Sequence, residues 1–77
     1  MNILVIAKTE TAPGYQPLGE ASSADEMQEL IPGWMKGLRN NGIAPTALEA
    51  WTRNGRGHWT LNEAFTQEAT KAMRAAR

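Results

Sequence analysis

The sequence predicts one small α+β domain, in which an antiparallel sheet packs on a central helix and the elements follow in the order β-β-α-β-β-α. Three observations predict this class. An apolar run opens the chain, two later segments begin with helix-capping residues, and an Asn-Gly pair separates two segments of strand character. At 77 residues we expect a single domain over residues 1–77, with a thin core because so short a chain buries little surface.

The first two strands are expected at residues 2–9 and 15–21. The first of these segments is rich in isoleucine and valine, which favours a buried strand. Pro13-Gly14 predicts a type II turn, since proline presets the first angle and glycine accepts the positive φ of the second. Pro17 cannot donate a ladder hydrogen bond, so the second strand should lie at an edge of the sheet with Pro17 facing outward.

The central helix has the clearest start in the chain. Ser23 and Glu26 have the spacing of a capping box, and 40–42 (Asn-Asn-Gly) supply a stop. Pro32 predicts a kink or a break over residues 31–33, because an interior proline removes a helical hydrogen bond. One apolar stripe can cover the sheet; it comprises Met27, Leu30, Ile31, Trp34 and Leu38.

Two interpretations compete for residues 45–61. In the hairpin interpretation, Asn54-Gly55 forms the centre of a type I′ turn. Counting outward from this turn pairs Arg53 with Arg56, Thr52 with Gly57, Trp51 with His58, and Ala50 with Trp59. We prefer this interpretation, because an isolated N-terminal hairpin would be marginal whereas a sheet of three or more strands under a helix is not.

The helical interpretation gives a short N-terminal strand followed by three helices. Here Thr46 and Glu49 form a capping box, and residues 47–53 form a helix that ends near Gly55. The Ala-Leu-Glu-Ala stretch has the intrinsic propensity for this. Residues 40–56 then have Gly42-Ile43 at a turn and Leu48 and Trp51 as inward positions of a second helix. This stretch partly resembles the helix-turn-helix of small repressors, which implies binding to DNA.

The last helix is expected to begin with a capping box formed by Thr60 and Glu63. Its apolar stripe is modest and comprises Leu61, Phe65, Ala69, Ala72, Met73 and Ala76. Lys71, Arg74 and Arg77 lie near its end, where positive charge complements the helix dipole. So weak a stripe fits packing either on the chain's own sheet or on a second subunit.

The residue types give little support for catalysis. The chain has no cysteine and one histidine, His58, while Ser22 and Ser23 already stand at a predicted helix start. A thiol nucleophile and a cysteine zinc site are excluded, and a Ser-His arrangement is disfavoured. One histidine with scattered carboxylates also lacks metal-ligand spacing. We therefore expect a protein that is not an enzyme and has no catalytic, cofactor or metal site.

The sequence favours a cytoplasmic protein that does not enter a membrane. It contains no apolar run near the roughly 18 residues that a membrane helix needs, and its first residues lack the pattern of a signal peptide. Freedom from cysteine suits a reducing compartment.

A protein-protein interaction, as an adaptor or inhibitor, is the expected function. Aromatic and arginine side chains carry most interface hot spots, and the predicted partner-binding residues are Trp51, Arg53, Arg56, His58, Trp59 and Tyr15. The net charge of zero favours a protein partner over nucleic acid. Whether the chain is a monomer or a homodimer stays open. In size and element order it resembles some small phage-encoded inhibitors, anti-CRISPR proteins among them, although no motif carries this likeness.

Nucleic-acid binding is the alternative. The basic hairpin at residues 51–59 combines arginines with two tryptophans, which suit phosphate contact and base stacking. Charge is also unevenly distributed, since residues 1–35 carry five acids against one base and residues 36–77 carry three acids against seven bases. A fold that interleaves the two halves would cancel this asymmetry at the surface.

Overall fold

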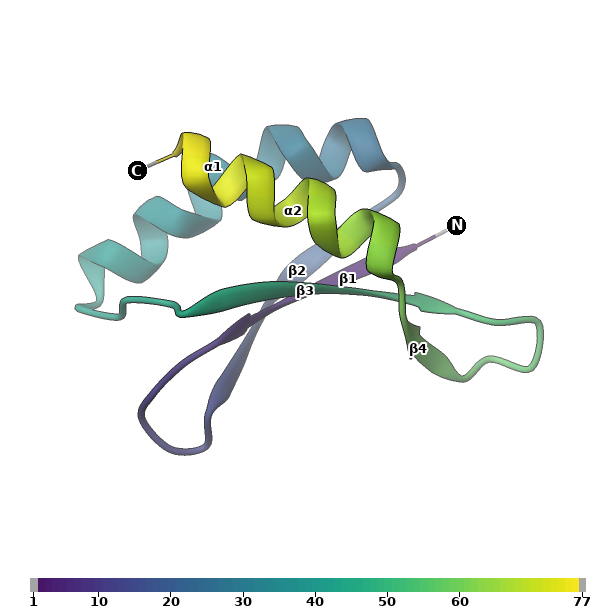
Figure 1. Cartoon of the computed structure of the whole chain (residues 1–77), viewed down its shortest axis with the longest axis horizontal. Coiled ribbons are helices and arrows are strands. Elements are labelled where there is room, and N and C mark those ends of the chain that lie inside the picture. The colour runs from purple at the N-terminus through teal and green to yellow at the C-terminus, as the bar shows by residue number, and fades with distance from the viewer. Residues whose placement is uncertain (1, 77) are drawn as a thin grey trace.

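The computed structural model describes residues 2–76 and confirms the predicted α+β class and element order (Figure 1). Arg77, the last of the predicted basic group, lies outside the described residues. The elements are β1 (Ile3–Lys8), β2 (Tyr15–Ala21), α1 (Ala24–Asn40), β3 (Ala47–Arg53), β4 (Trp59–Leu61) and α2 (Glu63–Ala75).

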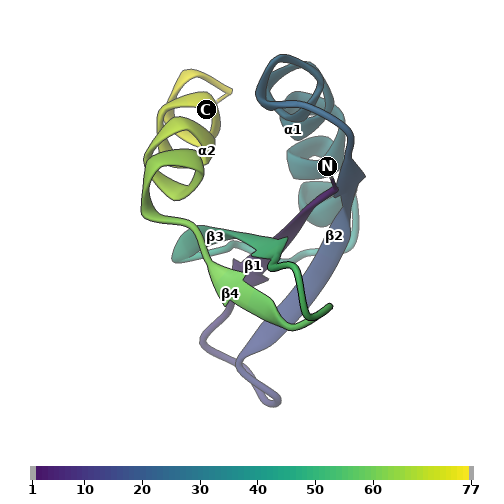
Figure 2. The same ribbon diagram turned by 90° about the vertical axis from the view of Figure 1, so that its right-hand side faces the viewer.

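The four strands form one antiparallel sheet in the order β2-β1-β3-β4. Both helices lie side by side on the same face of this sheet (Figure 2). The last helix, α2, packs against β3 and α1 of its own chain, which answers the question left open by its weak apolar stripe. Neither helix of the described chain has the length and apolar character that crossing a bilayer requires.

The core lies between the sheet and the two helices. Alternate residues of β1 (Ile3, Val5 and Ala7) are fully buried there, because successive side chains of a strand point to opposite faces. The rest of the core consists of Ala21, Met27, Ile31, Met35, Leu38, Leu48, Ala50, Ala69 and Met73. Several of these are alanines, so the helices approach the sheet closely and the core is shallow.

The turn between β1 and β2 differs from the expected type II turn. Gly14 N–H donates to the carbonyl of Thr11 (2.7 Å), and the peptide bond between Ala12 and Pro13 is cis. Pro13 therefore occupies the third position of the turn and not the second. Thr9 N–H closes the loop by donating to the carbonyl of Gly14 (3.0 Å), so Gly14, with φ of 91°, ends the turn.

β2 is an edge strand, as Pro17 predicts. Pro17 lies opposite Ile6 and beside an irregularity in the pairing, where Leu18 has no partner on β1. At such a bulge two successive positions share a face. Leu18 accordingly packs against the core, and a Cβ atom at the next position, Gly19, would point toward Trp34.

Gly19 allows α1 to approach β2. A Cβ atom at this position would lie 2.7 Å from Cζ2 of Trp34, closer than real Cβ contacts allow. The indole of Trp34 therefore lies against the bare backbone of the strand. This contact places Trp34 beside the core as a packing residue.

The boundaries of α1 follow the sequence closely. The Ser23 hydroxyl accepts from the N–H of Glu26 (3.1 Å), and the Glu26 carboxylate accepts from the N–H of Ser22 (2.9 Å), one residue before the expected partner. At the other end, Ile43 N–H donates to the carbonyl of Leu38 (2.9 Å) while Gly42 has φ of 71°. This is a Schellman motif, which satisfies carbonyls at the helix end.

The break expected at Pro32 does not occur, and α1 is one helix through this residue. Pro32 is exposed, so it points to water and not into the sheet. Water can bond the carbonyl one turn earlier, which loses its helical partner at a proline.

The helical interpretation of residues 47–53 is wrong, and with it the helix-turn-helix resemblance. These residues form β3, between β1 and β4, with Leu48 and Ala50 buried in alternation. β3 pairs with the whole length of β1. These tertiary interactions outweigh the helix propensity of Ala-Leu-Glu-Ala, because intrinsic propensity is only a weak preference.

The predicted capping box of the last helix is also misplaced. Thr60 belongs to β4, and the N-cap is Asn62, whose side chain accepts from the N–H of Phe65 (2.9 Å). Asparagine caps helices as well as threonine does, so the chain can extend β4 through Leu61 before the helix begins.

Candidate functional site

The candidate site is the face of the sheet that the helices leave open, here called the outer face. No part of residues 2–76 forms a second layer over it (Figures 1 and 2). Strand alternation and register assign its side chains, which are Leu4, Ile6 and Lys8 of β1, Tyr15, Pro17 and Glu20 of β2, Ala47, Glu49, Trp51 and Arg53 of β3, and Trp59 and Leu61 of β4.

An apolar row crosses the middle of the outer face. Trp51 lies directly opposite Leu4 on one side and Leu61 on the other, because β3 pairs with both β1 and β4. Leu61 is 43% exposed, although leucine is usually buried. Leu4 and Trp51 are half-buried by their neighbours. We call Leu4, Trp51 and Leu61 the apolar row.

Arg53 and Trp59 meet at the base of the hairpin. Their positions pair across β3 and β4, and the guanidinium carbon of Arg53 lies 4.9 Å from the centroid of the Trp59 ring. This is within the range of a cation–π contact. The contact holds a positive charge and an aromatic face together next to the apolar row.

The hairpin turn differs from the predicted type I′ turn. Among residues 2–76 only glycines have a positive φ, so Asn54 does not occupy a type I′ position. Instead Gly57 N–H donates to the carbonyl of Asn54 (3.0 Å), Asn54 N–H donates to the carbonyl of His58 (2.9 Å), and Gly57 has φ of 80°. These features describe a three-residue loop over 55–57 that ends in a left-handed glycine.

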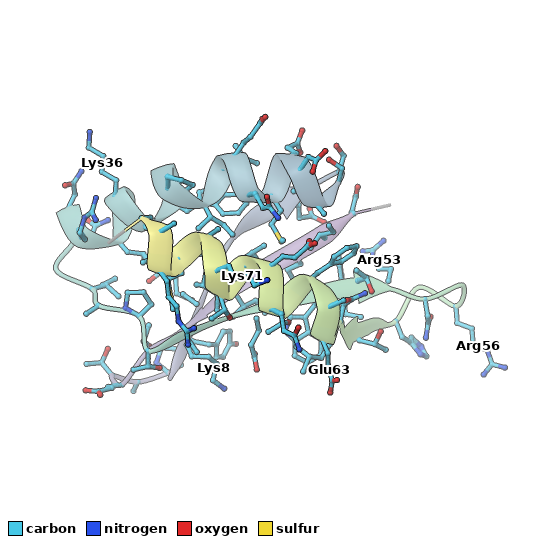
Figure 3. The ribbon with its side chains drawn as sticks, turned by 45° about the horizontal axis from the view of Figure 1, so that its top comes forward. Lys8, Lys36, Arg53, Arg56, Glu63 and Lys71 are labelled. Atoms are coloured by element: carbon cyan, nitrogen blue, oxygen red, sulfur yellow. The ribbon has the colours of Figure 1, made fainter. Side chains whose placement is uncertain are left out.

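The Asn54 side chain holds this loop in shape. Its Oδ1 accepts from the backbone N–H of Arg56 (2.9 Å) and of His58 (3.1 Å). The amide therefore turns the chain by satisfying two backbone donors, as asparagine commonly does in turns. Arg56 and His58 are exposed, and Arg56 extends from the tip away from the body of the molecule (Figure 3).

The structure brings together some of the predicted residues but not all of them. Trp51, Arg53 and Trp59 share the outer face at the base of the hairpin, while Arg56 and His58 stand at its tip. Tyr15 also lies on the outer face, 51% exposed, but at the opposite corner, where it pairs with Lys8. Of the predicted partner-binding residues, Tyr15 is therefore the one that lies apart from the hairpin.

The indole N–H of Trp51 is an unusual feature of this surface. Nε1 is covered by neighbouring atoms and donates to no acceptor within residues 2–76. The indole lies between Leu4 and Leu61 at the centre of the apolar row.

Charges of both signs surround the apolar row in equal number. Lys8 and Arg53 are the positive side chains of the outer face, and Glu20 and Glu49 are the negative ones. Lys8 lies at one end of the sheet and Arg53 near the other (Figure 3). The face is therefore neutral, and it gives no continuous positive track for a phosphate backbone.

Sequence reasoning missed Leu4, Ile6, Glu49 and Leu61 as surface residues. The signal was present in the first strand: if Ile3 and Val5 face the core, then Leu4 and Ile6 must face the other way. The alternation alone does not show that this second face stays uncovered, because a helix on each side would bury both.

The rest of the described surface has small hollows and no cluster of metal ligands. Within residues 2–76 no group of three histidine, aspartate or glutamate side chains is placed to hold a metal ion. The surface hollows are small. One of about 230 Å³ lies between β2 and α1 beside Trp34, and another of about 280 Å³ lies beside Met35 and Arg39.

Comparisons with protein-family models, with curated proteins and with solved structures found no match to this chain.

Proposed function

We propose that the protein is a non-enzymatic binding module, an adaptor or inhibitor, whose working surface is the outer face around Trp51, Arg53 and Trp59. The observation that carries this proposal is the presence of two tryptophans on a sheet face that has no second layer. A contiguous exposed apolar patch with polar surroundings is typical of a protein-interaction site.

The composition of this surface supports a protein partner. Tryptophan and arginine are the residue types most enriched at interface hot spots, and here the Arg53–Trp59 contact orders both side chains before binding. An ordered side chain loses less conformational entropy when a partner docks. The neutral charge of the face disfavours a polyanion such as nucleic acid.

The sheet edges are poorly suited to binding a further strand. β2 is interrupted by Pro17 and the bulge at Leu18, and β4 has only three residues. Prolines, bulges and short edge strands are features that block strand addition in natural proteins. The flat face of the sheet is therefore the surface that supports docking.

A pair of similarly exposed leucines provides a direct test. Leu61 on the outer face is 43% exposed, and Leu30 on α1 is 37% exposed. Tagged wild-type protein, Leu61→Glu and Leu30→Glu would each be incubated with lysate of the source cells, with and without nuclease. Captured proteins would be identified by mass spectrometry and captured nucleic acid by staining. We expect one protein in near-stoichiometric amount with wild type and Leu30→Glu, and its loss with Leu61→Glu.

Two outcomes would contradict the proposal. Equal capture by Leu61→Glu, confirmed as folded by circular dichroism, would remove the outer face as the binding surface. Capture of nucleic acid, with all protein lost after nuclease treatment, would favour the nucleic-acid alternative. In that case a charge reversal of Arg53 and Arg56 should abolish retention.

A further inference from the structure

The charges next to Trp51 are arranged in a way that matches a second copy of the same surface. Glu49 and Arg53 stand two residues before and two residues after Trp51 on the outer face of β3. Residues two apart along a strand are separated by about 7 Å. One strand thus presents a negative charge, a tryptophan and a positive charge in line.

We infer that a second copy of the chain docks on the outer face, sheet against sheet, in a dimer whose twofold axis runs along the apolar row. This inference rests on the proposed function of that face as a protein-binding surface, and it names the partner. An axis through the row and perpendicular to the strands sets the row on itself, with Leu4 over Leu4 and Trp51 over Trp51 of the other copy.

The same operation reverses the direction of β3, so Glu49 of each copy lies over Arg53 of the other. Because a twofold interface is self-complementary, the first ion pair implies the second. Both pairs adjoin the apolar row and would be shielded from water by it, which increases their contribution.

The short length of β4 agrees with this arrangement. The axis places Trp59 of one copy over the part of the other copy that follows Leu61. Because β4 ends at Leu61, no strand residue lies there, and the indole of Trp59 has room. Glu20 at the end of the row would approach its own copy, but it is exposed on the edge strand, where solvent screens the repulsion.

Sedimentation equilibrium tests the inference with two reciprocal variants. Wild type should approach twice the mass of the 8.4 kDa chain as its concentration rises from micromolar to millimolar. Glu49→Arg alone would place arginines against Arg53, and Arg53→Glu alone would place glutamates against Glu49. Each should dimerise at least about tenfold more weakly, since like charges at an interface are strongly unfavourable.

A mixture of the two variants is the decisive sample. In a mixed dimer each introduced charge faces an opposite charge, so both ion pairs return and the mixture should dimerise as wild type does. A folding failure cannot produce this recovery. Glu29→Arg, at an exposed position of α1, makes the same change in charge on the helix side and should leave dimerisation unchanged.

Several results would overturn the inference. These are a wild type that stays monomeric at all concentrations, single variants that dimerise as wild type does, or a mixture that gains nothing over either variant alone. A monomeric wild type whose captured protein is still lost with Leu61→Glu would remove the dimer and leave the proposed function standing. A dimer that forms equally well with Leu61→Glu would show that the second copy docks elsewhere and would overturn the inference.

Discussion

Arg53 lies over the ring of Trp59, at 4.9 Å from its centroid, because a three-residue loop sets their two strands in register. In the expected type I′ register Trp59 would lie opposite Ala50, which is buried beneath the helices. In the observed register Trp59 lies opposite Arg53 instead. Ala50 and Arg53 are an odd number of residues apart on β3, so their side chains point to opposite faces of the sheet. The turn therefore decides that Trp59 belongs to the outer face.

The Arg53–Trp59 contact should be measurable as a coupling energy. In a double-mutant cycle with Arg53→Ala and Trp59→Ala, urea unfolding at low protein concentration should give a coupling of about 0.5–1 kcal/mol, as expected for an exposed cation–π pair. The control is a cycle with Arg56→Ala and Trp59→Ala. It should give no coupling energy, because Arg56 extends away from the tip of the hairpin. Equal coupling in both cycles would contradict the assigned contact.

Gly57 should be less tolerant of substitution than Gly55. Gly57 has φ of 80°, where a side chain is strained, whereas Gly55 lacks a positive φ. A Cβ atom at either position would contact nothing within 4 Å. Gly57→Ala should therefore lower the free energy of unfolding by about 1–2 kcal/mol relative to Gly55→Ala. A larger loss of unfolding free energy with Gly55→Ala would contradict the observed loop and favour the type I′ turn predicted from the sequence.

Gly19 and Gly37 should respond to alanine in opposite directions. Gly19→Ala would force the indole of Trp34 away from β2 and should destabilise the fold by about 1–3 kcal/mol. Gly37 lies in α1 with open space around it, so Gly37→Ala should stabilise by about 0.5–1 kcal/mol. Chemical unfolding of both variants, followed by tryptophan fluorescence and circular dichroism, checks this; stabilisation by Gly19→Ala would show that Trp34 does not pack there.

The start of α2 can be tested by two further alanine variants. Asn62→Ala removes the bond to the N–H of Phe65 and should lower the free energy of unfolding by about 1 kcal/mol. Thr60→Ala removes only a long contact to the carbonyl of Thr52 (3.4 Å) at an exposed position, so we expect less than about 0.5 kcal/mol. Thermal melts rank the two variants, and the opposite ranking would restore Thr60 as the cap.

Much of the first half of the fold could be predicted because its signals are local. The isoleucine and valine run predicted β1, Pro17 predicted an edge strand, and Ser23 predicted the start of α1. Each depends on residues within a few positions of one another. The break considered at Pro32 does not occur, because Pro32 is exposed and water can bond the carbonyl that loses its helical partner.

The second half was harder because its signals compete. Residues 47–50 have helical propensity yet form a strand, and Thr60 has capping spacing yet belongs to β4. Asn54-Gly55 correctly indicated a hairpin but not its register, because Gly57 supplies a second position where the chain can turn. Of the predicted contact residues, the structure groups Trp51, Arg53 and Trp59 and separates Tyr15 from them.

The sequence by itself determined where β1, β2 and α1 begin, and which residues of β1 share a face. Only the tertiary structure decided that both helices cover the same side, which leaves Leu4, Trp51 and Leu61 on the open side. The physical reason is the range of the interactions. Caps, turns and alternation act over a few residues, whereas the face that a helix covers depends on pairing between β1 and β3, which lie some forty residues apart in the chain.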